Sequence, residues 1–357
     1  MNNLKLTTAA LFTAAATTAQ AGIDRSGQNI GILFEEGNYV ELSFANVSPD
    51  IAGTNPFVGS ISQSAVDYNS FGFGFKKQIN DQWSFALIYD QPYGANISYE
   101  NTPIQIPFPP GSANPAMAEV KSHALSGIVR YEMGNGFSVH GGLRAQKLSG
   151  AILSGDGQLE ASSEYDLGGL VGVAYERPDI AMRVALTYFT AIEHDLTGTH
   201  NLLPATGNVE MPAAFNLDFQ TGIAANTLLF GSVRYAKWDG ITLSSNSDVF
   251  GPVDWVDFVE DITTYKLGLG RKLNDNWSIA GTVSYTSGSD VGTTLLAPAG
   301  ATTSIGLGAT YTQDNMKIQA GVQYSMIDEK TVTTGIGPTT FSDGNALAFG
   351  MKVGFSF

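Results

Sequence analysis

The sequence predicts an all-β protein, a transmembrane antiparallel β-barrel of about 14 strands, with a short N-terminal segment inside the lumen. Three observations lead to this fold class. The closing segment, residues 346–357, alternates cleanly between apolar and small or polar residues. Short turns and long connections alternate along the chain. The composition, with 41 glycines, 11% aromatic and only 14% charged residues, is typical of one large β structure.

The alternation of the closing segment has a period of two, which indicates a β-strand with a different solvent on each face. An apolar face beside a small, polar face fits a strand between lipid and a lumen. An edge strand of a soluble sandwich is the alternative interpretation. The apolar face carries Leu347, Phe349, Met351, Val353, Phe355 and Phe357, and the other carries Ala346, Ala348, Gly350, Lys352, Gly354 and Ser356.

The start of the chain has the features of an export signal. Lys5 precedes an apolar run, and Ala19-Gln20-Ala21 supplies small residues for a signal peptidase. We therefore expect a signal peptide at residues 1–21 and a mature start at Gly22. After it, no stretch reaches the roughly 18 apolar residues of a membrane-spanning helix, so a closed barrel is the remaining way to span a membrane.

Composition also limits the chemistry. The sequence has no cysteine, so it offers no disulfide and no thiolate metal ligand. Lys+Arg number 18 against 33 Asp+Glu, a net charge of -15, which would repel a polyanion. We expect no nucleic-acid partner.

Two parts of the chain are expected after the signal, a short plug segment and the barrel. Residues 22–37 do not alternate, and Ile30, Ile32, Leu33 and Phe34 make them too apolar for a free tail. We expect this segment to be tucked into a barrel formed by residues 38–357. The first strand is expected at Tyr39–Val47, ending at Ser48-Pro49 because proline cannot donate to a ladder.

The connections set the strand count. Tight turns alternate with stretches rich in Gly, Pro, Ser, Thr and Asp, and together they require about 14 strands with both chain ends on the short-turn side. The expected tight turns are Asn80-Asp81, Gly134-Asn135-Gly136, Pro178-Asp179, Ala225-Asn226, Asn274-Asp275 and Asp314-Asn315. The expected long loops are 49–68, 100–117, 149–162, 191–212, 239–260, 287–301 and 326–344.

Strand parity assigns side chains to the two faces. Outward sets such as Leu125 with Val129, or Ile305 with Leu307, are apolar. On this parity several cations point inward, where they could receive a carboxylate headgroup or simply balance acidic lumen residues. These cations are Arg130, Arg144, Arg183, Arg234 and Lys266.

One strand is interrupted by a proline. Asp90-Gln91-Pro92-Tyr93-Gly94 breaks the alternation that begins at Trp83, and proline within a strand forfeits a ladder hydrogen bond. Because a closed barrel has no edge to hold a proline, we expect the segment to bend inward and leave a gap in the wall. The alternative is that Pro92 starts the long loop beyond it.

Four segments together carry a family resemblance: Asn80-Asp81-Gln82-Trp83 through Tyr93-Gly94, Met211-Pro212, Tyr235-Ala236-Lys237-Trp238, and Asn274-Asp275-Asn276-Trp277 through Phe357. In their order and spacing they resemble the FadL-type family of outer-membrane transporters for long-chain fatty acids and other hydrophobic compounds. The resemblance implies a fourteen-stranded barrel, an N-terminal hatch and a lateral opening at a kink in the third strand. The family's asparagine-proline-alanine hatch signature is missing from residues 22–37.

Catalytic and metal-binding patterns find little support. His194 and His200 share a loop with Asp195, but their spacing matches no common zinc pattern, and His123 and His140 are isolated. An acidic loop could bind calcium but lacks EF-hand spacing. We expect no enzyme activity, no cofactor and no metal. The acidic loop holds Asp248, Asp254, Asp257, Glu260 and Asp261.

The predicted function is passive uptake of long-chain fatty acids or similar hydrophobic molecules across the outer membrane of a Gram-negative bacterium. Release would be lateral, through the kink at Asp90–Gly94. Expected partners are the substrate, a fatty acid or hydrocarbon, outer-membrane lipid and lipopolysaccharide, and the barrel-assembly machinery. A general diffusion porin, a barrel-embedded lipid hydrolase and a structural or adhesive barrel are the alternatives.

Overall fold

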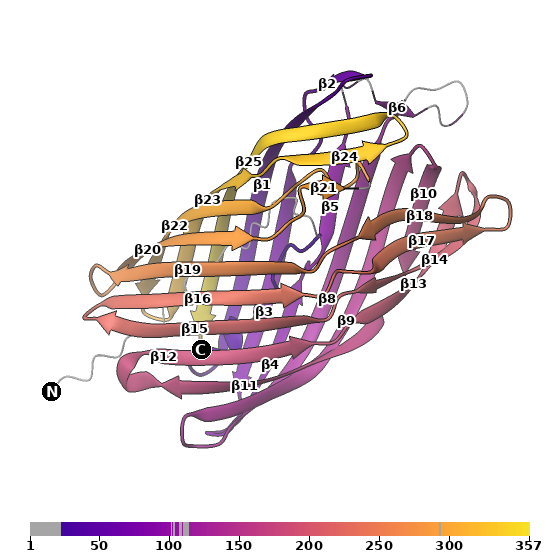
Figure 1. Cartoon of the computed structure of the whole chain (residues 1–357). Helices are drawn as coiled ribbons and strands as arrows, with labels where there is room; N and C mark the ends of the chain where they lie inside the picture. Colours follow the sequence, from indigo (N-terminus) through magenta and orange to yellow (C-terminus); the bar gives the residue numbers. More distant parts are fainter. Residues whose placement is uncertain (1–22, 101, 103, 107–108, 110–113, 293) are drawn as a thin grey trace.

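The computed structural model describes residues 23–357 except 101, 103, 107–108, 110–113 and 293. The expected signal peptide, residues 1–21, and Gly22 lie outside these residues. The chain forms a closed, 14-strand antiparallel barrel, which confirms the predicted fold class. The barrel closes where β1 (Tyr39–Asn55) pairs with β25 (Gly337–Ser356), beginning with Tyr39 opposite Ser356 (Figure 1).

Many barrel strands consist of two consecutive labelled segments that meet at an irregularity. The first half of the chain contains β2 (Gly59–Ile61), β3 (Tyr68–Gln78), β4 (Trp83–Asp90), β5 (Gly94–Ser98), β6 (Gln105–Ile106), β7 (Asn114–Pro115), β8 (Met117–Glu132), β9 (Phe137–Ser154), β10 (Gly157–Ser163), β11 (Asp166–Arg177) and β12 (Met182–Phe189). The second half contains β13 (Ile192–His200), β14 (Leu203–Met211), β15 (Ala214–Ala224), β16 (Thr227–Ala236), β17 (Ile241–Ser247), β18 (Gly251–Phe258), β19 (Ile262–Lys272), β20 (Trp277–Thr286), β21 (Val291–Gly292), β22 (Thr302–Gln313), β23 (Met316–Ile327) and β24 (Lys330–Thr334). Two short 3-10 helices are η1 (Gly31–Phe34) and η2 (Pro178–Ile180).

The two ends of the barrel differ. At one, which we call the turn end, short turns join the strands and both ends of the barrel chain lie there. At the other, the hairpin end, long β-hairpins project beyond the barrel (Figure 1). Two turn-end connections that are near copies in sequence have the same hydrogen bond: Asn80 Oδ1 accepts from Trp83 N at 2.9 Å, and Asn274 Oδ1 from Trp277 N at 2.8 Å.

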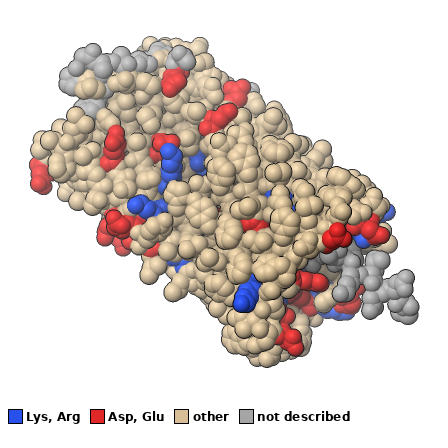
Figure 2. All heavy atoms as spheres, turned by 180° about the vertical axis from the view of Figure 1, so that it is seen from behind, with Lys and Arg blue, Asp and Glu red and all other residues tan. Residues whose placement is uncertain are grey.

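The alternation predicted for the closing segment is present in β25. Leu347, Phe349 and Met351 are exposed on the outer face, whereas Ala346 and Ala348 are buried. Neutral residues cover most of the outer surface seen in Figure 2, and the acidic and basic side chains lie mainly toward its ends. This is the surface of a strand wall that faces lipid.

The first strand does not end at Pro49, as expected, but continues to Asn55. Pro49 lies opposite Ala346 of β25, and the ladder between β1 and β3 has already stopped at Val47. The Pro49 carbonyl oxygen accepts a hydrogen bond from Gln63 Nε2, so its nitrogen faces the same side, away from β25. A missing N–H on that side breaks no ladder hydrogen bond.

Most of the expected long loops, including 326–344, are also mostly strand. The stretches 149–162, 191–212 and 239–260 form hairpins that extend the barrel wall at the hairpin end. Their outward residues, such as Asp195 and Glu210, are exposed and polar, while Leu196 and Val209 on the inner face are buried. The outward positions of these strands are polar because they face water and not lipid. This gives the strands the composition of loops, which is why the sequence pattern predicted loops here.

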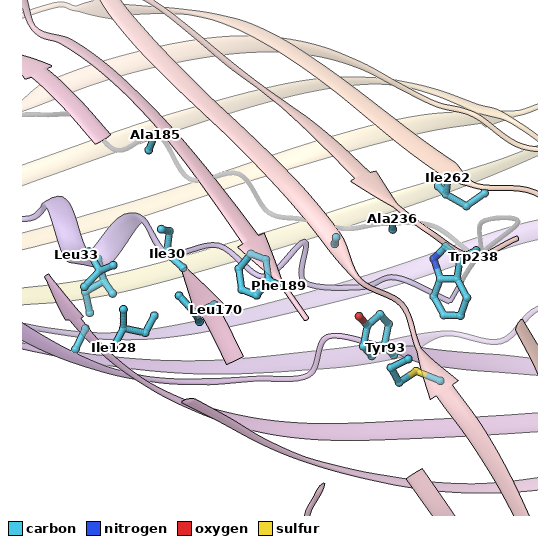
Figure 3. Close-up of a cluster of buried hydrophobic side chains, with 14 of the residues drawn as sticks. Ile30, Leu33, Tyr93, Ile128, Leu170, Ala185, Phe189, Ala236, Trp238 and Ile262 are labelled. Carbon is cyan, nitrogen blue, oxygen red and sulfur yellow. The ribbon is translucent and has the colours of Figure 1, made fainter. Parts of the chain in front are cut away.

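Two large buried clusters occupy the interior. One joins η1 to the barrel wall, and Figure 3 shows Leu33 close to Ile128, with Phe189 and Trp238 further along. The other packs across the hairpin end and includes Ile61, Tyr99, Trp255, Leu296 and Phe341. None of the helices within the described ranges is long and apolar enough to cross a membrane.

Candidate functional site at the break in the third strand

The predicted interruption lies between β4 and β5. Both strands pair with β8, but Asp90 is opposite Ala124 and Gly94 is opposite Lys121, so the kinked strand has one residue more than its partner. Ser122 bridges the irregularity, because its hydroxyl accepts from Tyr93 N at 2.8 Å and donates to Tyr93 O at 2.6 Å. The segment is a β-bulge with a proline at its centre. The chain therefore continues as strand beyond Pro92, and Pro92 does not start a loop.

On its other side the kinked strand leaves its neighbour. β3 pairs with β4 from Gln78 to Phe73, and among the described residues β5 has no pairing with the remainder of β3. The Gln91 side chain partly replaces the ladder, since its Oε1 accepts from Phe71 N at 3.0 Å. The wall is thus interrupted between β3 and the start of β5, which we call the wall break. It closes again where Val66 N donates to Asn96 O at 3.0 Å and Ser98 N donates to Ser64 O at 3.2 Å.

The wall break lies in the lipid-facing part of the barrel. Beside it, Leu42, Phe71 and Leu125 are exposed on the outer face. Phe71 packs on Phe44 of β1 with ring centroids 5.2 Å apart. Whatever passes through the break would therefore meet apolar side chains on the outside.

Residues 23–25 cover the wall break from inside. Arg25 N donates to Pro92 O at 2.7 Å, and Gly94 N donates to Ile23 O at 2.8 Å. Asp24, between them, forms an isolated bridge with Tyr93. Backbone groups that the missing ladder left unpaired are satisfied by this segment, as a non-aqueous environment requires.

Asp24 anchors the segment to the opposite side chains of the lumen. Its carboxylate accepts from Arg234 Nη2 at 2.6 Å and from Trp238 Nε1 at 2.8 Å. Gln28 adds to the same network, accepting from Arg234 Nη1 at 3.1 Å and donating to the Tyr93 hydroxyl at 3.2 Å. Tyr93 and Trp238 also meet edge to face, with ring centroids 5.7 Å apart (Figure 3).

Arg25 connects the two strands that the break separates. Its Nη2 donates to Asn96 Oδ1 of β5 at 2.6 Å, and its guanidinium carbon lies 3.8 Å from the ring centroid of Tyr68 on β3. Gly94 makes room for it, because a Cβ at that position would lie 2.6 Å from the guanidinium. Arg25 is therefore a bridge across the wall break made by a cation–π contact and a hydrogen bond.

Two cavities meet at Arg25. The upper cavity, nearer the hairpin end, has a volume of about 90 Å³. We call it the apolar chamber, because most of its lining is apolar and includes Leu148, Leu196, Val209 and Met211. The lower, of about 210 Å³, reaches the wall break at Phe71 and Gln91 and also contains charged groups, among them Arg183, Asp218 and Lys266. Arg25 lines both, so its side chain forms part of the partition between an apolar chamber and the interrupted wall.

The apolar residues predicted for the plug segment are buried. Leu33 is fully buried, and Ile32 and Phe34 are nearly so. Phe34 lies between two of the predicted inward cations, with the guanidinium carbons of Arg130 and Arg183 at 4.6 and 4.4 Å from its ring centroid. Just beyond, Glu35 Oε1 accepts from Lys317 at 2.8 Å.

The predicted cations all point inward, but they do not form one site. Arg130 forms an ion pair with Glu176, and Arg234 binds Asp24. Arg144 is buried, with its guanidinium 6.0 Å from the Phe189 ring centroid. Of the five predicted cations, Arg183 and Lys266 line the lower cavity, together with Arg25 and Lys352.

The strongest contacts at the break involve residues that sequence reasoning missed, namely Asp24, Arg25, Tyr68 and Asn96. A charged pair directly after the expected signal peptide was the available signal. Its partners could not be found, because Asn96 and Trp238 are 71 and 214 positions away from the residues that bind them.

The acidic residues near the hairpin end are not a loop cluster. Asp254 and Asp257 lie on β18 and are exposed, Asp248 lies at the tip of the β17–β18 hairpin, and Asp261 binds the backbone of Asp239. Within the part of the chain that the structure describes, no group of three or more His, Asp or Glu is arranged to hold a metal ion.

Comparison with known proteins identifies the fold. No protein-family model and no curated protein matches the sequence. Among solved structures, a FadL homologue of Pseudomonas aeruginosa superposes with a TM-score of 0.76 at 14% identity, covering 98% of each chain. The toluene transporter TodX of Pseudomonas putida gives 0.67 at 14% identity, covering 94% of this chain and 97% of that one. The toluene transporter TbuX of Ralstonia pickettii gives 0.62 at 14% identity, covering 91% and 90%. The resemblance inferred from sequence is thus confirmed at the level of the fold.

Proposed function

We propose that this chain is an outer-membrane channel for the passive uptake of hydrophobic small molecules, which it releases sideways into the membrane through the wall break. The observation that carries the proposal is the position of Arg25, between an apolar cavity and an interrupted wall. Solved structures with the same fold include two toluene transporters and a FadL homologue, which supports a hydrophobic substrate such as a hydrocarbon or a long-chain fatty acid.

In this proposal residues 22–37 act as a hatch, and residues 1–21 are the signal peptide that directs the chain to the outer membrane. The hairpin end faces the outside. The hatch is held by buried apolar contacts around Leu33 and by ion pairs of Asp24 and Glu35, so it obstructs a straight aqueous path through the lumen. A general diffusion porin would need that path to be open.

The direction of release follows from solvation. A hydrophobic chain gains about 0.8 kcal/mol per methylene by entering lipid instead of water, so a sideways exit is favoured over an aqueous one. The exit at the break is bordered by Phe71 and Leu125 on the lipid side. Opening it requires the Arg25 bridge to Tyr68 and Asn96 to separate, which costs about one hydrogen bond and one cation–π contact, or roughly 2 kcal/mol.

Two substitutions with opposite expected effects test the proposal. Arg25→Ala removes the bridge and should raise the rate of toluene uptake into proteoliposomes about threefold or more, because the partition is weakened. Gly94→Glu places a bulky charged side chain where a Cβ already meets the guanidinium, and should reduce uptake to about a tenth or less.

The control for the second variant is Gly155→Glu, at a hairpin tip where a Cβ would meet nothing within 4 Å. Folding is monitored by the electrophoretic mobility of the unheated barrel. Undiminished uptake by folded Gly94→Glu would rule out the lateral exit. Slower uptake by Arg25→Ala would show that Arg25 supports the site and does not restrict it.

A further inference from the structure

The barrel wall has a second irregular place, near the hairpin end. β19 and β20 pair as far as Thr264 and Thr286. Beyond this point β18 pairs with β17, and no pairing on its other edge occurs within the described ranges. The chain after β20 turns away from β18, and β21 pairs in parallel with β24, with Thr331 N donating to Asp290 O at 2.8 Å.

The reason for this detour is the late start of the next strand. β22 begins only at Thr302, so beyond the end of β20 no strand lies between β20 and β23 in the described residues. β21 moves across to β24 and pairs through Val291 and Gly292. Because β21 pairs with β24 and not with β18, the edge of β18 that faces away from β17 borders a gap in the wall.

A small cavity of about 20 Å³ occupies this gap. One side is lined by Val259 and Glu260, after β18, and the other by Ser289, Val291 and Thr294. Val259 and Val291 are 56% and 58% exposed, so two apolar side chains border the cavity at the surface of the molecule. Three charged side chains, Asp257, Glu260 and Lys330, also line it.

The small cavity adjoins the apolar chamber. Phe258 and Ala297 line both of them, so these two side chains form the boundary between the gap and the space around Leu196 and Val209. Along the barrel axis the chamber is instead covered by the buried cluster of the hairpin end, where Tyr99 donates from its hydroxyl to Leu295 O at 2.6 Å.

We propose that hydrophobic molecules enter the apolar chamber sideways, between β18 and residues 289–292, passing Phe258 and Ala297. The proposal rests on the proposed function, since it supplies the entrance for the same chamber. The cavity of about 20 Å³ is only slightly larger than the roughly 10–15 Å³ that one water molecule needs. It is therefore too small for a hydrophobic substrate, and the passage must widen to admit one. The movable side is β21, a short strand whose described pairing with β24 is at Val291 and Gly292.

Blocking the mouth tests the entrance. The natural sequence has no cysteine, so Val291→Cys offers a single thiol for a charged, bulky methanethiosulfonate reagent. The probe is N-phenyl-1-naphthylamine, a neutral hydrophobic fluorophore, added to the full-length protein in lipid nanodiscs in a stopped-flow experiment. Asp248→Cys, exposed at the tip of the neighbouring hairpin, is the matched control. Ser289→Cys lines the same mouth and serves as a second blocking position.

A block at the entrance changes rates and not affinity. We expect labelling of Val291→Cys or Ser289→Cys to slow association of the probe about fivefold or more, with equilibrium affinity unchanged within about twofold and no effect at Asp248→Cys. Unchanged association after labelling at both mouth positions would overturn the entrance and leave the proposed function standing. A wild-type protein that does not bind the probe would overturn the proposed function, and the entrance with it.

Discussion

The two halves of the barrel wall have opposite polarity. In the turn-end half, β12 exposes Val184 and Leu186 and buries Thr187. In the hairpin-end half, the continuation of the same strand, β13, exposes Glu193 and Asp195 and buries Leu196. Both segments alternate with a period of two. What differs is the solvent outside, lipid around β12 and water around β13, and with it the character of the lumen.

The change of polarity coincides with a shift of parity. Inward positions run through Ala185, Thr187 and Phe189 in β12, and then through Ile192 and His194 in β13, so the chain gains one residue between them. Thr190 absorbs the irregularity by exchanging hydrogen bonds with Gly169 of the neighbouring strand, both at 2.9 Å.

The comparison explains the location of the proposed site. An apolar chamber can form only where the strands place their apolar residues inside, which is the half of the wall that leaves the lipid. The wall break lies in the other half, where the outside is apolar. A hydrophobic molecule would start in the apolar chamber, where the inner face of the wall is apolar, and leave at the wall break, where the outer face is apolar. Arg25 lies between the two places.

A charge placed on the outer face of each half of the wall tests most directly whether the two halves face different solvents. Leu307→Arg, at a side chain that is 66% exposed on the outer face of β22, should cost about 2–4 kcal/mol near the midplane. Thr197→Arg, on the outer face of β13, should cost less than about 0.5 kcal/mol, because it faces water. Refolding titrations in lipid vesicles measure both. Equal costs would mean that the lipid boundary lies higher on the wall than β13.

The inner face gives the reverse test. Val209→Asp puts a carboxylate into the apolar chamber and should weaken binding of N-phenyl-1-naphthylamine about tenfold or more, because it removes apolar contact and favours water in the chamber. Its neighbour Glu210 faces outward, so Glu210→Gln should leave the affinity unchanged. Similar affinities for the two variants would show that the probe binds elsewhere.

The smallest effect is expected at a hairpin tip. Leu202 has a positive φ of 68° and is 72% exposed, so it adopts a left-handed conformation without burying its side chain. Leu202→Gly should stabilise the barrel by about 1 kcal/mol. Urea unfolding in micelles measures the change. Asn226→Gly at a turn-end connection, with φ 58°, should gain less because asparagine tolerates this conformation. A destabilised Leu202→Gly would mean that this leucine packs against something outside the chain.

Much of the fold was predictable because it depends on local pattern. The alternation of β25, the turns at Asn80 and Asn274, and the inward direction of Arg130 and Arg144 all follow from a period of two and from turn chemistry. The error over the stretches 149–162, 191–212 and 239–260 has a physical cause. Strands with a polar face toward water have the composition of loops, and their inner apolar residues become recognisable only when the opposite wall is known.

The sequence by itself determined the barrel, its strand count and the position of the break at Asp90–Gly94, since proline, turns and alternation act over a few residues. Only the tertiary structure decided that the broken strand separates from β3 and that Arg25 bridges Tyr68 and Asn96. It also decided that two cavities meet at the Arg25 side chain. These contacts join segments far apart in the chain, and closing the barrel is what brings them together. No local pattern encodes them, because their energy depends on a partner that the sequence neighbourhood does not contain.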